Sequence, residues 1–378
     1  AAYREFVAGE VAPHADAWDQ AECVPRAAID RLAAEGYLGA ILPASVGGLG
    51  LDMPALGILH EEVGRGCSSM RSLLTVHSML AYSISRWGNR AQKDRWLEPL
   101  AAGTALGAFA LTEPNIGSDA RSVQTTATRS GSGFVLDGCK RWITFGQVAD
   151  VFVLFARCDD KPTAFLLERN TPGLSVQPLH GILGTRASML AELRLEGCEI
   201  PRESVIGGLG FGFAAVGASA LDIGRFSVAS GSVGIGQACL DASLHYASER
   251  SQYGSKLKDH QLIAQMVTDM VTNVRAARLL CYEAAYLKEA GDLQATTALL
   301  VAKYFASTMA ARAASDAVQI HGANGCGPGA SVQRYYRDAK VMEIIEGSSQ
   351  IQQITIAMQA FQAFDLERFT TPAAPAPR

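Results

Sequence analysis

The hydrophobic and polar positions divide the chain into three stretches with different periods. From about residue 3 to 102, apolar residues recur every three or four positions, as at Ile29 and Leu32. That spacing is typical of amphipathic helices that pack on a core. From about residue 105 to 206 short β-rich runs alternate with turn residues, and from about 207 to 369 the helical period returns. The pattern therefore predicts helices, then strands, then helices again.

The middle stretch contains the expected strands. Gly131–Gly133 precedes the run Phe134–Leu136, and Asp137-Gly138 separates that run from Lys140–Thr144, which is typical of a β-hairpin turn. Further strands are expected at Val151–Arg157, Ala164–Glu168, Leu174–Pro178 and Leu190–Leu195. Because no helical pattern lies between these runs, an antiparallel sandwich or barrel is favoured over a parallel sheet.

The last stretch predicts long helices. They are expected at about Phe213–Arg250, Asp259–Ala290, Leu293–Ile320, Val332–Glu346 and Ser348–Phe364. Helices longer than the usual 10 to 14 residues suit a bundle. The predicted α+β chain thus has an N-terminal α-helical domain (1–104), a central antiparallel β-domain (105–206), a C-terminal four-helix bundle (207–370) and a disordered tail (371–378).

Charge and composition exclude several classes of function. The 378 residues carry a net charge of -4, and no basic cluster offers a surface to nucleic acid or to an acidic membrane. No apolar run approaches the roughly 20 residues that span a bilayer, and no signal peptide is recognisable. Eight cysteines are scattered singly without zinc spacing, so we expect reduced thiols, no metal and a cytoplasmic location. Because the first residue is Ala1, we expect the native chain to begin upstream.

Common nucleotide and metal fingerprints are missing from the sequence. Neither Gly208–Gly212 nor Gly234–Gly236 completes GxGxxG after a strand, and GxxxxGK[ST] does not occur. A Rossmann or P-loop protein is therefore disfavoured. A di-iron site is disfavoured as well, because no Glu is followed by a His three residues later.

Two segments of the β-rich stretch suit a flat, acceptor-rich ring. Phe109–Asp119 (FALTEPNIGSD) ends an apolar run with hydroxyls, a Pro that fixes a turn and a Gly that lets backbone approach a ligand. In Trp142-Ile143-Thr144 the alternation of a strand places indole and hydroxyl on one face. Each segment alone also fits an ordinary loop or strand. Together they favour a planar heterocyclic cofactor.

The segment Val341–Ile351 (VMEIIEGSSQI) places a carboxylate before a helix start. Glu346 ends one predicted helix, Gly347 acts as a hinge, and Ser348 and Ser349 are good N-cap residues for the next helix. A general base beside a helix N-terminus, which favours an anion, is one interpretation. A helix–loop–helix corner with a solvated Glu is the other.

Several polar residues of the helical stretches remain ambiguous on their own. Arg250 either neutralises a phosphate or interacts with the end of its helix. Glycines after Gln319 mark either a turn or close approach to a ligand.

Taken in order, these motifs resemble the acyl-CoA dehydrogenase family. They are LTEPNIGSD, WIT, SERSQYG, HQ, QIHGANG, RDAK and IIEGSSQIQ, and the resemblance covers about residues 3 to 364. It implies a helical domain, a small β-domain and a C-terminal four-helix bundle, with FAD between β-domain and bundle and partly held by a neighbouring subunit.

The resemblance also implies roles for individual residues. The FAD contacts would be Phe109, Leu111, Thr112, Gly117, Ser118, Trp142, Ile143, Thr144, Arg250, Gln252, Tyr253, Gln261, Gln319, Gly322, Ser348 and Gln350. The substrate contacts would be Ser118, Asp222, Arg225 and Gly347. Glu346 matches the catalytic base. A minority branch takes its base from the position before Arg225, which here is Gly224, and this supports Glu346. We assign Glu343, near Lys340, to structure.

Two runs resemble one branch in particular. Cys67–Ser72 and Met342–Glu346 are similar to the acyl-carrier-protein dehydrogenases of polyketide extender-unit pathways, which oxidise a three-carbon acyl group toward hydroxymalonyl or methoxymalonyl units. The alternatives are a short-chain acyl-CoA dehydrogenase, an acyl-CoA oxidase or flavin monooxygenase, and a non-catalytic scaffold. The expected partners are an acyl thioester on carrier protein or CoA, an electron-accepting flavoprotein or oxygen, and further copies of the chain in a homodimer or homotetramer.

Overall fold

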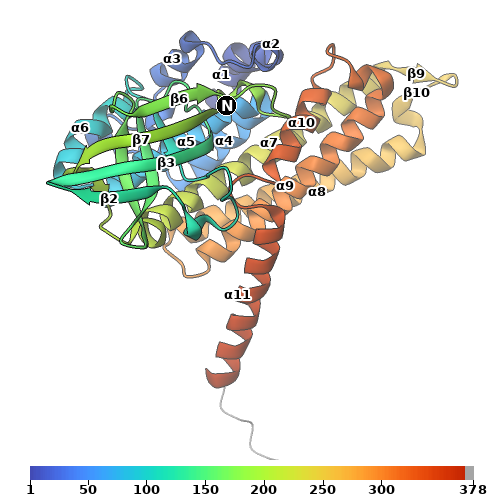
Figure 1. Ribbon diagram of the computed structural model, residues 1–378. Coiled ribbons are helices and arrows are strands. Elements are labelled where there is room, and N and C mark those ends of the chain that lie inside the picture. The colour runs from blue at the N-terminus through green and yellow to red at the C-terminus, as the bar shows by residue number, and fades with distance from the viewer. Residues whose placement is uncertain (371–378) are drawn as a thin grey trace, which may run out of the picture.

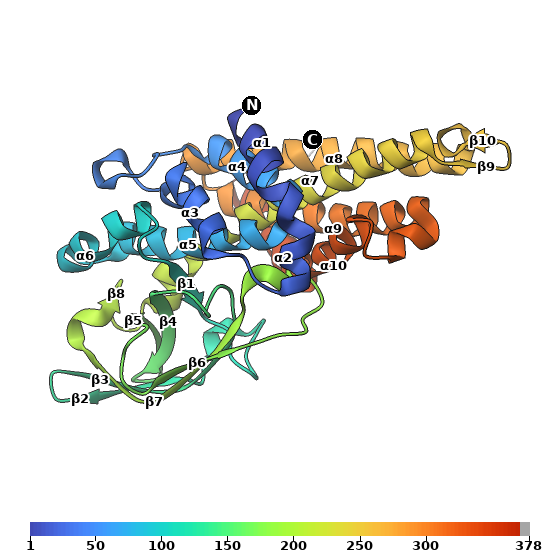
Figure 2. The same ribbon diagram turned by 90° about the horizontal axis from the view of Figure 1, so that it is seen from above.

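The computed structural model describes residues 1–370, which form a helical layer and a β-domain packed on one of its sides (Figures 1 and 2). The predicted tail lies outside the described residues. In this part of the chain no helix combines the length and apolarity needed to cross a bilayer.

The N-terminal third is helical, as the 3-to-4-residue spacing predicts. Its helices are α1 (Ala2–Phe6), α2 (Ala15–Ala21), α3 (Arg26–Ala34), α4 (Met53–Gly66), α5 (Ser68–Trp87) and α6 (Arg90–Ala101). Asn89 and Gln92 form a capping box at the start of α6. Helix α5 is buried along most of its length, because α4, α6 and α7, the sheet and the loop between β6 and β7 all pack against it. Its polar residues therefore lie in the interior.

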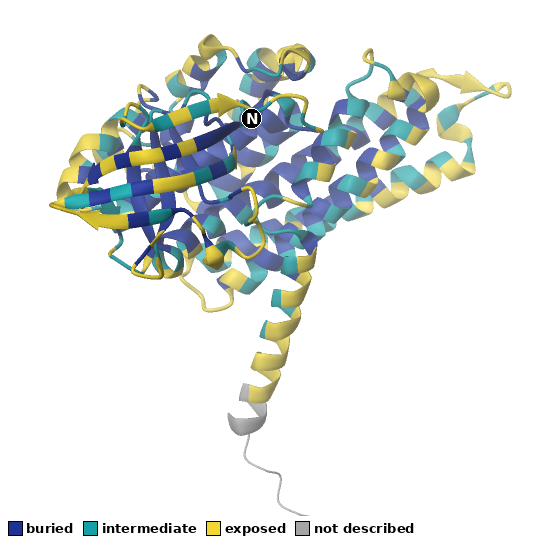
Figure 3. Ribbon diagram, in the orientation of Figure 1, coloured by how far each residue is buried: buried dark blue, intermediate teal, exposed yellow. Residues whose placement is uncertain are grey.

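The middle third is a single eight-stranded sheet. Its strands are β1 (Gly107–Ala110), β2 (Thr126–Ser130), β3 (Gly133–Ile143), β4 (Val151–Cys158), β5 (Lys161–Glu168), β6 (Leu174–Pro178), β7 (Ala191–Pro201) and β8 (Val205–Ile206). The order is β6-β7-β3-β2-β4-β5-β8, with β1 beside β4. Most pairs are antiparallel as expected, while β1 and β2 pair with β4 in parallel. Strand β3 alternates buried residues with partly or fully exposed ones along much of its length (Figure 3).

The hairpin predicted at Asp137-Gly138 is wrong. Residues Gly133–Ile143 form one continuous strand, and the hairpin turn lies earlier, at Gly131 between β2 and β3. Gly138 has φ 148° and sits at a register shift against β7. A Cβ there would lie 2.7 Å from Thr125 Oγ1. Gly138 is therefore needed for a bulge and a close approach, not for a turn.

The last third is helical again. It contains α7 (Ala218–Glu249), a small hairpin of β9 (Ser251–Gln252) and β10 (Ser255–Lys256), then α8 (Gln261–Glu289), α9 (Ala295–His321), α10 (Val332–Met342) and α11 (Ser349–Thr370). Helices α7, α8, α9 and α10 pack together, and α11 extends away from the body with much of its surface exposed (Figures 1 and 3). The fold thus matches the predicted three-part class.

Candidate active site

The corner between α10 and α11 has an unusual backbone. Helix α10 ends at Met342, so the prediction that Glu346 ends the helical run is wrong by four residues. Glu346 has φ 55° and Gly347 has φ 92°, two left-handed residues in succession. The Ile351 N–H donates to Ser348 Oγ at 3.4 Å, which confirms Ser348 as a cap of α11. A left-handed Glu costs on the order of 1–3 kcal/mol, and such residues cluster at functional sites. We call Glu346–Ser348 the base corner.

Buried donors hold the carbonyls of the base corner. Lys303 Nζ, from α9, donates to Gly347 O at 2.7 Å. Gln352 Nε2 donates to Glu346 O at 3.1 Å and to Gly347 O at 3.2 Å. Lys303 and Gln352 are both buried. The left-handed turn is thus fixed by contacts from two other elements.

The Glu346 carboxylate sits in a desolvated place surrounded by cations. The residue keeps some accessible surface, but its Oε2 is buried and has no hydrogen-bond partner in the described chain. Burial raises the pKa of Glu346 to about 7, although Arg225, Arg71 and Lys303 act in the opposite direction. A carboxyl that titrates near neutral pH is well matched to general-base catalysis.

Arg71, on α5, is a fully buried cation near Glu346. Its guanidinium donates to Thr75 Oγ1 at 2.9 Å, to Ser72 Oγ at 3.1 Å and to Met342 Sδ at 3.3 Å. No carboxylate of residues 1–370 forms an ion pair with Arg71, and its Nε has no partner. Burial lowers the pKa of Arg71 to about 10, and the charge of Glu346 partly offsets this. A buried charge without a counter-ion is costly and indicates a missing partner.

Asp222 and Arg225, on α7, form a second polar cluster. Arg225 donates to Asp222 at 3.1 Å, and Lys288 of α8 donates to the same carboxylate at 2.7 Å. Arg225 Nε remains buried and unpaired. Since Arg225 also acts to lower the pKa of Glu346, the structure brings this predicted substrate contact near the base corner.

The segments Phe109–Thr112 and Trp142–Thr144, which we call the ring segments, lie side by side. The Arg141 N–H donates to Thr112 O at 2.9 Å. Lys140 Nζ donates to Leu111 O at 3.1 Å and to Glu113 Oε1 at 2.7 Å. Both charged side chains of this pair are buried. The pair therefore ties the two ring segments together from behind.

Hydrogen bonds through a loop and helix α10 also link the ring segments to the base corner. The Phe145 N–H donates to Ser188 O at 2.8 Å. Further along that loop, the Thr185 N–H donates to Asp338 Oδ1 of α10 at 2.5 Å. Helix α10 leads directly into Glu346. The structure thus connects the predicted ring site to the predicted base.

The ring segments fit a flat cofactor such as a flavin. Trp142 has φ 63° and leaves 49% of its surface exposed, which is unusual for an indole. Its Nε1 and the Thr112 and Thr144 hydroxyls have no hydrogen-bond partner in residues 1–370. An apolar ring surface flanked by free donors is what an aromatic group with edge acceptors requires. Gly117 and Ser118 lie exposed in the loop that follows.

The other predicted FAD contacts lie elsewhere in the fold. We call them the distal group: Arg250, Gln252, Tyr253, Gln261, Gln319 and Gly322. They surround the β9–β10 hairpin and the adjacent ends of α7, α8 and α9, where Tyr246 stacks on His321 with centroids 4.2 Å apart. Figures 1 and 2 show this hairpin at the opposite end of the molecule from the β-domain. The distal group therefore does not join the ring segments within one chain.

Two residues beside the base corner, Lys303 and Arg71, are missing from the predicted site residues. Glu343 pairs with Lys340 at 2.9 Å, which confirms its structural role. Gln350 is exposed at the start of α11. Lys303 belongs to none of the quoted motifs, and Arg71, although it lies in the run Cys67–Ser72, has no role that this run alone indicates, because only the folded chain brings both to Glu346. The one sign of Lys303 in the sequence is a basic residue within an otherwise apolar helical run.

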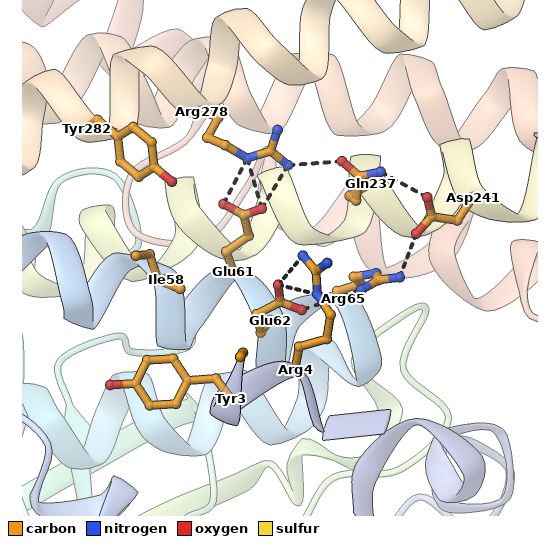
Figure 4. A pocket seen from close by; sticks show the side chains of 11 residues that line it. Tyr3, Arg4, Ile58, Glu61, Glu62, Arg65, Gln237, Asp241, Arg278 and Tyr282 are labelled. Atoms are coloured by element: carbon orange, nitrogen blue, oxygen red, sulfur yellow. Dashed lines mark hydrogen bonds and ion pairs between the residues drawn. The ribbon is translucent and has the colours of Figure 1, made fainter. Parts of the chain in front are cut away.

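The hollow in Figure 4 does not belong to this site. It measures about 520 Å³ and lies where α1, α4, α7 and α8 meet. Its charges neutralise one another: Glu61 pairs with Arg278 at 2.8 Å, and Arg65 with Asp241 at 2.7 Å. Such a set of satisfied pairs joins the helices and leaves no free group for chemistry.

Comparison with known proteins identifies the family. Three family models match: "Acyl-CoA dehydrogenase, N-terminal domain" at residues 1–104, "middle domain" at 108–198 and "C-terminal domain" at 210–361. The chain therefore belongs to the acyl-CoA dehydrogenase family, whose members are FAD-dependent oxidoreductases of acyl thioesters.

Three known proteins are similar over nearly the whole chain. The mitochondrial short-chain specific acyl-CoA dehydrogenase of Rattus norvegicus is 37% identical over 367 residues, covering 96% of this chain and 89% of the relative. A glutaryl-coenzyme A dehydrogenase solved with glutaryl-CoA is 36% identical, with a TM-score of 0.92 and coverage of 95% and 93%. FkbI, described as acting in biosynthesis of the methoxymalonyl extender unit of the polyketide Fk520, is 34% identical, with a TM-score of 0.87 and coverage of 95% and 98%.

Proposed function

We propose that this enzyme oxidises a three-carbon acyl group carried by an acyl carrier protein, at C3, on the way to a hydroxymalonyl- or methoxymalonyl-type extender unit. Glu346 is the general base. The observation that carries the proposal is Arg71, a buried guanidinium near the base with no carboxylate partner in the described chain. The similarity to FkbI supports the same branch.

Arg71 suits an oxygen-bearing acyl group better than a hydrocarbon one. Its hydrogen-bond partners in residues 1–370 are two hydroxyls and a thioether, none of them charged, and its Nε is unpaired. A plain alkyl tail offers this guanidinium no acceptor and leaves it desolvated. A hydroxyl, hydrate, carbonyl or carboxylate oxygen at C3 accepts a charge-assisted hydrogen bond. A short acyl group also keeps that oxygen near Glu346.

Glu346 then removes the substrate proton. Its carboxylate is poised by a pKa of about 7, and Arg71, Arg225 and Lys303 stabilise negative charge both on Glu346 and on the substrate from which the proton leaves. The Glu346 backbone N–H has no acceptor in residues 1–370 and is free to bind the thioester carbonyl. FAD, when bound, would supply the acceptor for the hydride from C3, so a C3 alcohol would become a carbonyl as its hydroxyl proton passes to Glu346.

The residues for FAD come from two copies of the chain. The ring segments hold the ring system, with Ser348 and Gln350 beside it, and the distal group holds the adenine dinucleotide half. Because the distal group lies at the other end of the molecule, a neighbouring copy supplies it (Figure 2). Arg250 and Tyr253 support this, since both project from an exposed hairpin without a partner in residues 1–370; Tyr253 is 99% exposed.

A second candidate is α,β-dehydrogenation of a short acyl-CoA. It is favoured by the identity of 37% to the rat short-chain enzyme, slightly above the 34% to FkbI. In that reaction Glu346 removes the α-proton of the thioester while the carbonyl is held by backbone N–H, and the hydride leaves from Cβ.

Anaerobic reduction of the bound flavin separates the two candidates. The purified enzyme is mixed with 2,3-dihydroxypropanoyl and butyryl thioesters, each on CoA and on an acyl carrier protein, and bleaching of the flavin absorbance is followed. We expect the hydroxylated group on carrier protein to reduce the flavin fastest. Faster reduction by butyryl-CoA contradicts the proposal and supports the second candidate.

Replacement of Arg71 provides the matched control. In Arg71→Met we expect the rate with the hydroxylated thioester to fall on the order of 10²-fold, because a charged hydrogen bond to the reacting group is lost. The butyryl rate should change far less, since that chain makes no such bond. An equal loss with both substrates indicates that Arg71 serves only the structure of the pocket.

A further inference from the structure

Lys303 is a buried lysine of α9 with a single hydrogen bond. The side chain has no exposed surface, and Nζ donates only to Gly347 O, at 2.7 Å. The structure records no ion pair for Lys303 within residues 1–370. Because a buried ammonium costs several kcal/mol unless it is compensated, its position at the base corner calls for a reason.

The hydrogen bond from Lys303 holds Gly347, the residue that follows Glu346. Gly347 O belongs to the peptide that joins Gly347 to Ser348, directly after the two left-handed residues Glu346 and Gly347. Gln352 shares this carbonyl at 3.2 Å but is itself on α11, which follows the base corner directly in the chain. Lys303 is on α9, a long helix packed between α7 and α8. It is therefore the donor that ties the base corner to the rigid bundle.

Lys303 is also one of three cations that face Glu346 from different helices. Arg71 approaches from α5, Arg225 from α7 and Lys303 from α9. The groups that face Lys303 in turn are Glu346, Glu343 and Arg225, and burial lowers the pKa of Lys303 to about 8. Arg71 and Arg225 have other hydrogen-bond partners on or beside their own helices. Within residues 1–370, Lys303 donates a hydrogen bond only to the base corner.

We propose that Lys303 is a positioning residue for the catalytic base: its hydrogen bond to Gly347 O sets the orientation of the Glu346 carboxylate, and its charge favours the ionised form of that carboxylate. The inference rests on the proposed role of Glu346 as the base. It is independent of which acyl group or carrier the enzyme uses.

Two substitutions separate the hydrogen bond from the charge. Lys303→Gln keeps a donor for Gly347 O but removes the charge, and Lys303→Met removes both. Arg312→Gln, which removes an exposed cation from the same helix, is the control. For each variant the rate of anaerobic flavin reduction is measured from pH 5 to 9, with whichever thioester of the panel above reduces the native enzyme fastest. Flavin content and melting temperature are measured in parallel.

We expect both Lys303 variants to move the acidic limb of the rate profile upward by about one pH unit, because loss of a nearby cation raises the pKa of a carboxyl. Only Lys303→Met should also lower the plateau rate, by about tenfold or more, because the carboxylate loses its alignment. Arg312→Gln should behave as the native enzyme. If Lys303→Met does not fold, the pH of the acidic limb in Lys303→Gln still decides whether the charge of Lys303 matters.

An unmoved limb in Lys303→Gln overturns the proposal, even if the variant melts at a lower temperature, since a purely structural lysine changes stability alone. Native plateau rates in Lys303→Met overturn the positioning role. Glu346→Gln is measured beside them: if it keeps native activity, the base assignment itself fails, and that result is distinct from either outcome at Lys303.

Discussion

Gly224 and Glu346 occupy adjoining space in a way that excludes any side chain at position 224. A Cβ built on Gly224 would lie 2.2 Å from Glu346 Oε2. The same Cβ would lie 3.0 Å from Met79 Sδ. The base thus fills the volume that a residue at position 224 would otherwise use. A carboxylate from α7 at this position and one from the base corner are mutually exclusive.

Gly224→Ala tests this relationship. The methyl group must displace the Glu346 carboxylate, and we expect the rate of flavin reduction to fall on the order of 10²-fold, as for a misplaced catalytic group. Alanine is the better helix former, so propensity alone would stabilise α7 by about 1 kcal/mol. The measurement is single-turnover kinetics with flavin content as a check. A native rate would show that the base has room to move.

Glu346→Gln should abolish most activity and leave the protein intact. Glutamine has nearly the same shape but accepts no proton, so we expect a loss of about 10²–10⁴-fold in the rate of flavin reduction. Flavin content and the visible spectrum should stay as in the native enzyme. Undiminished turnover would remove Glu346 from the role of base.

The same variant should be more stable than the native enzyme in alkaline solution. Burial raises the folded pKa of Glu346 from 4.5 to about 7. Between these values the folded state binds a proton that the unfolded state lacks, so the native enzyme loses stability as pH rises through this window. At pH 8 Glu346→Gln should gain up to about 3 kcal/mol, since one pKa unit corresponds to about 1.4 kcal/mol.

Urea unfolding at equal protein concentration checks this expectation, and the gain should vanish near pH 4.5. A constant difference between the two proteins at every pH would show that the carboxyl is not strained by burial.

Lys140→Met should weaken flavin binding, because Lys140 holds the two ring segments together. It leaves the Glu113 carboxylate buried without its ammonium, which costs about 3–5 kcal/mol for such pairs. We expect a lower melting temperature and less bound flavin per chain by absorbance. The double variant Glu113→Gln with Lys140→Met removes both charges and should recover much of the stability. Full flavin content in Lys140→Met would show that the ring segments are held by other contacts.

The layout of the fold is visible in the periodicity of the sequence, while its exceptions depend on tertiary contacts. The spacing of apolar residues distinguishes helices from strands because it reflects which faces are buried. Asp137-Gly138 has the composition of a turn, but Gly138 serves a bulge because Thr125 leaves no room for a Cβ. The helical run does not continue through Glu346, because Glu346 and Gly347 are left-handed and their carbonyls are held by Lys303 and Gln352. Lys303 is 44 residues away from Gly347 in the sequence.

The candidate site likewise contains some residues that the sequence reveals and others that only the packing reveals. Trp142, Thr144 and Glu346 belong to short motifs whose chemistry can be interpreted residue by residue. Lys303 belongs to no such motif, and the role of Arg71 cannot be interpreted from the run Cys67–Ser72 alone, because each becomes relevant only when α5 and α9 pack beside the base corner. A buried charge can be found from contacts and exposure but not from a single sequence. The packing of the helices therefore determines which cation shifts the pKa of which carboxylate.

In the proposed arrangement each cofactor site is a joint product of two chains, because the ring segments and the distal group lie at opposite ends of one chain. Two variants with different defects should therefore repair each other when mixed. A chain with Glu346→Gln still offers an intact distal group, and a chain with Arg250→Glu still offers an intact base. Random pairing of equal amounts gives mixed pairs half the time, each with one complete site of two, so we expect about a quarter of native activity from two nearly inactive proteins after joint refolding. The catalytic unit is then the contact between copies rather than the single polypeptide.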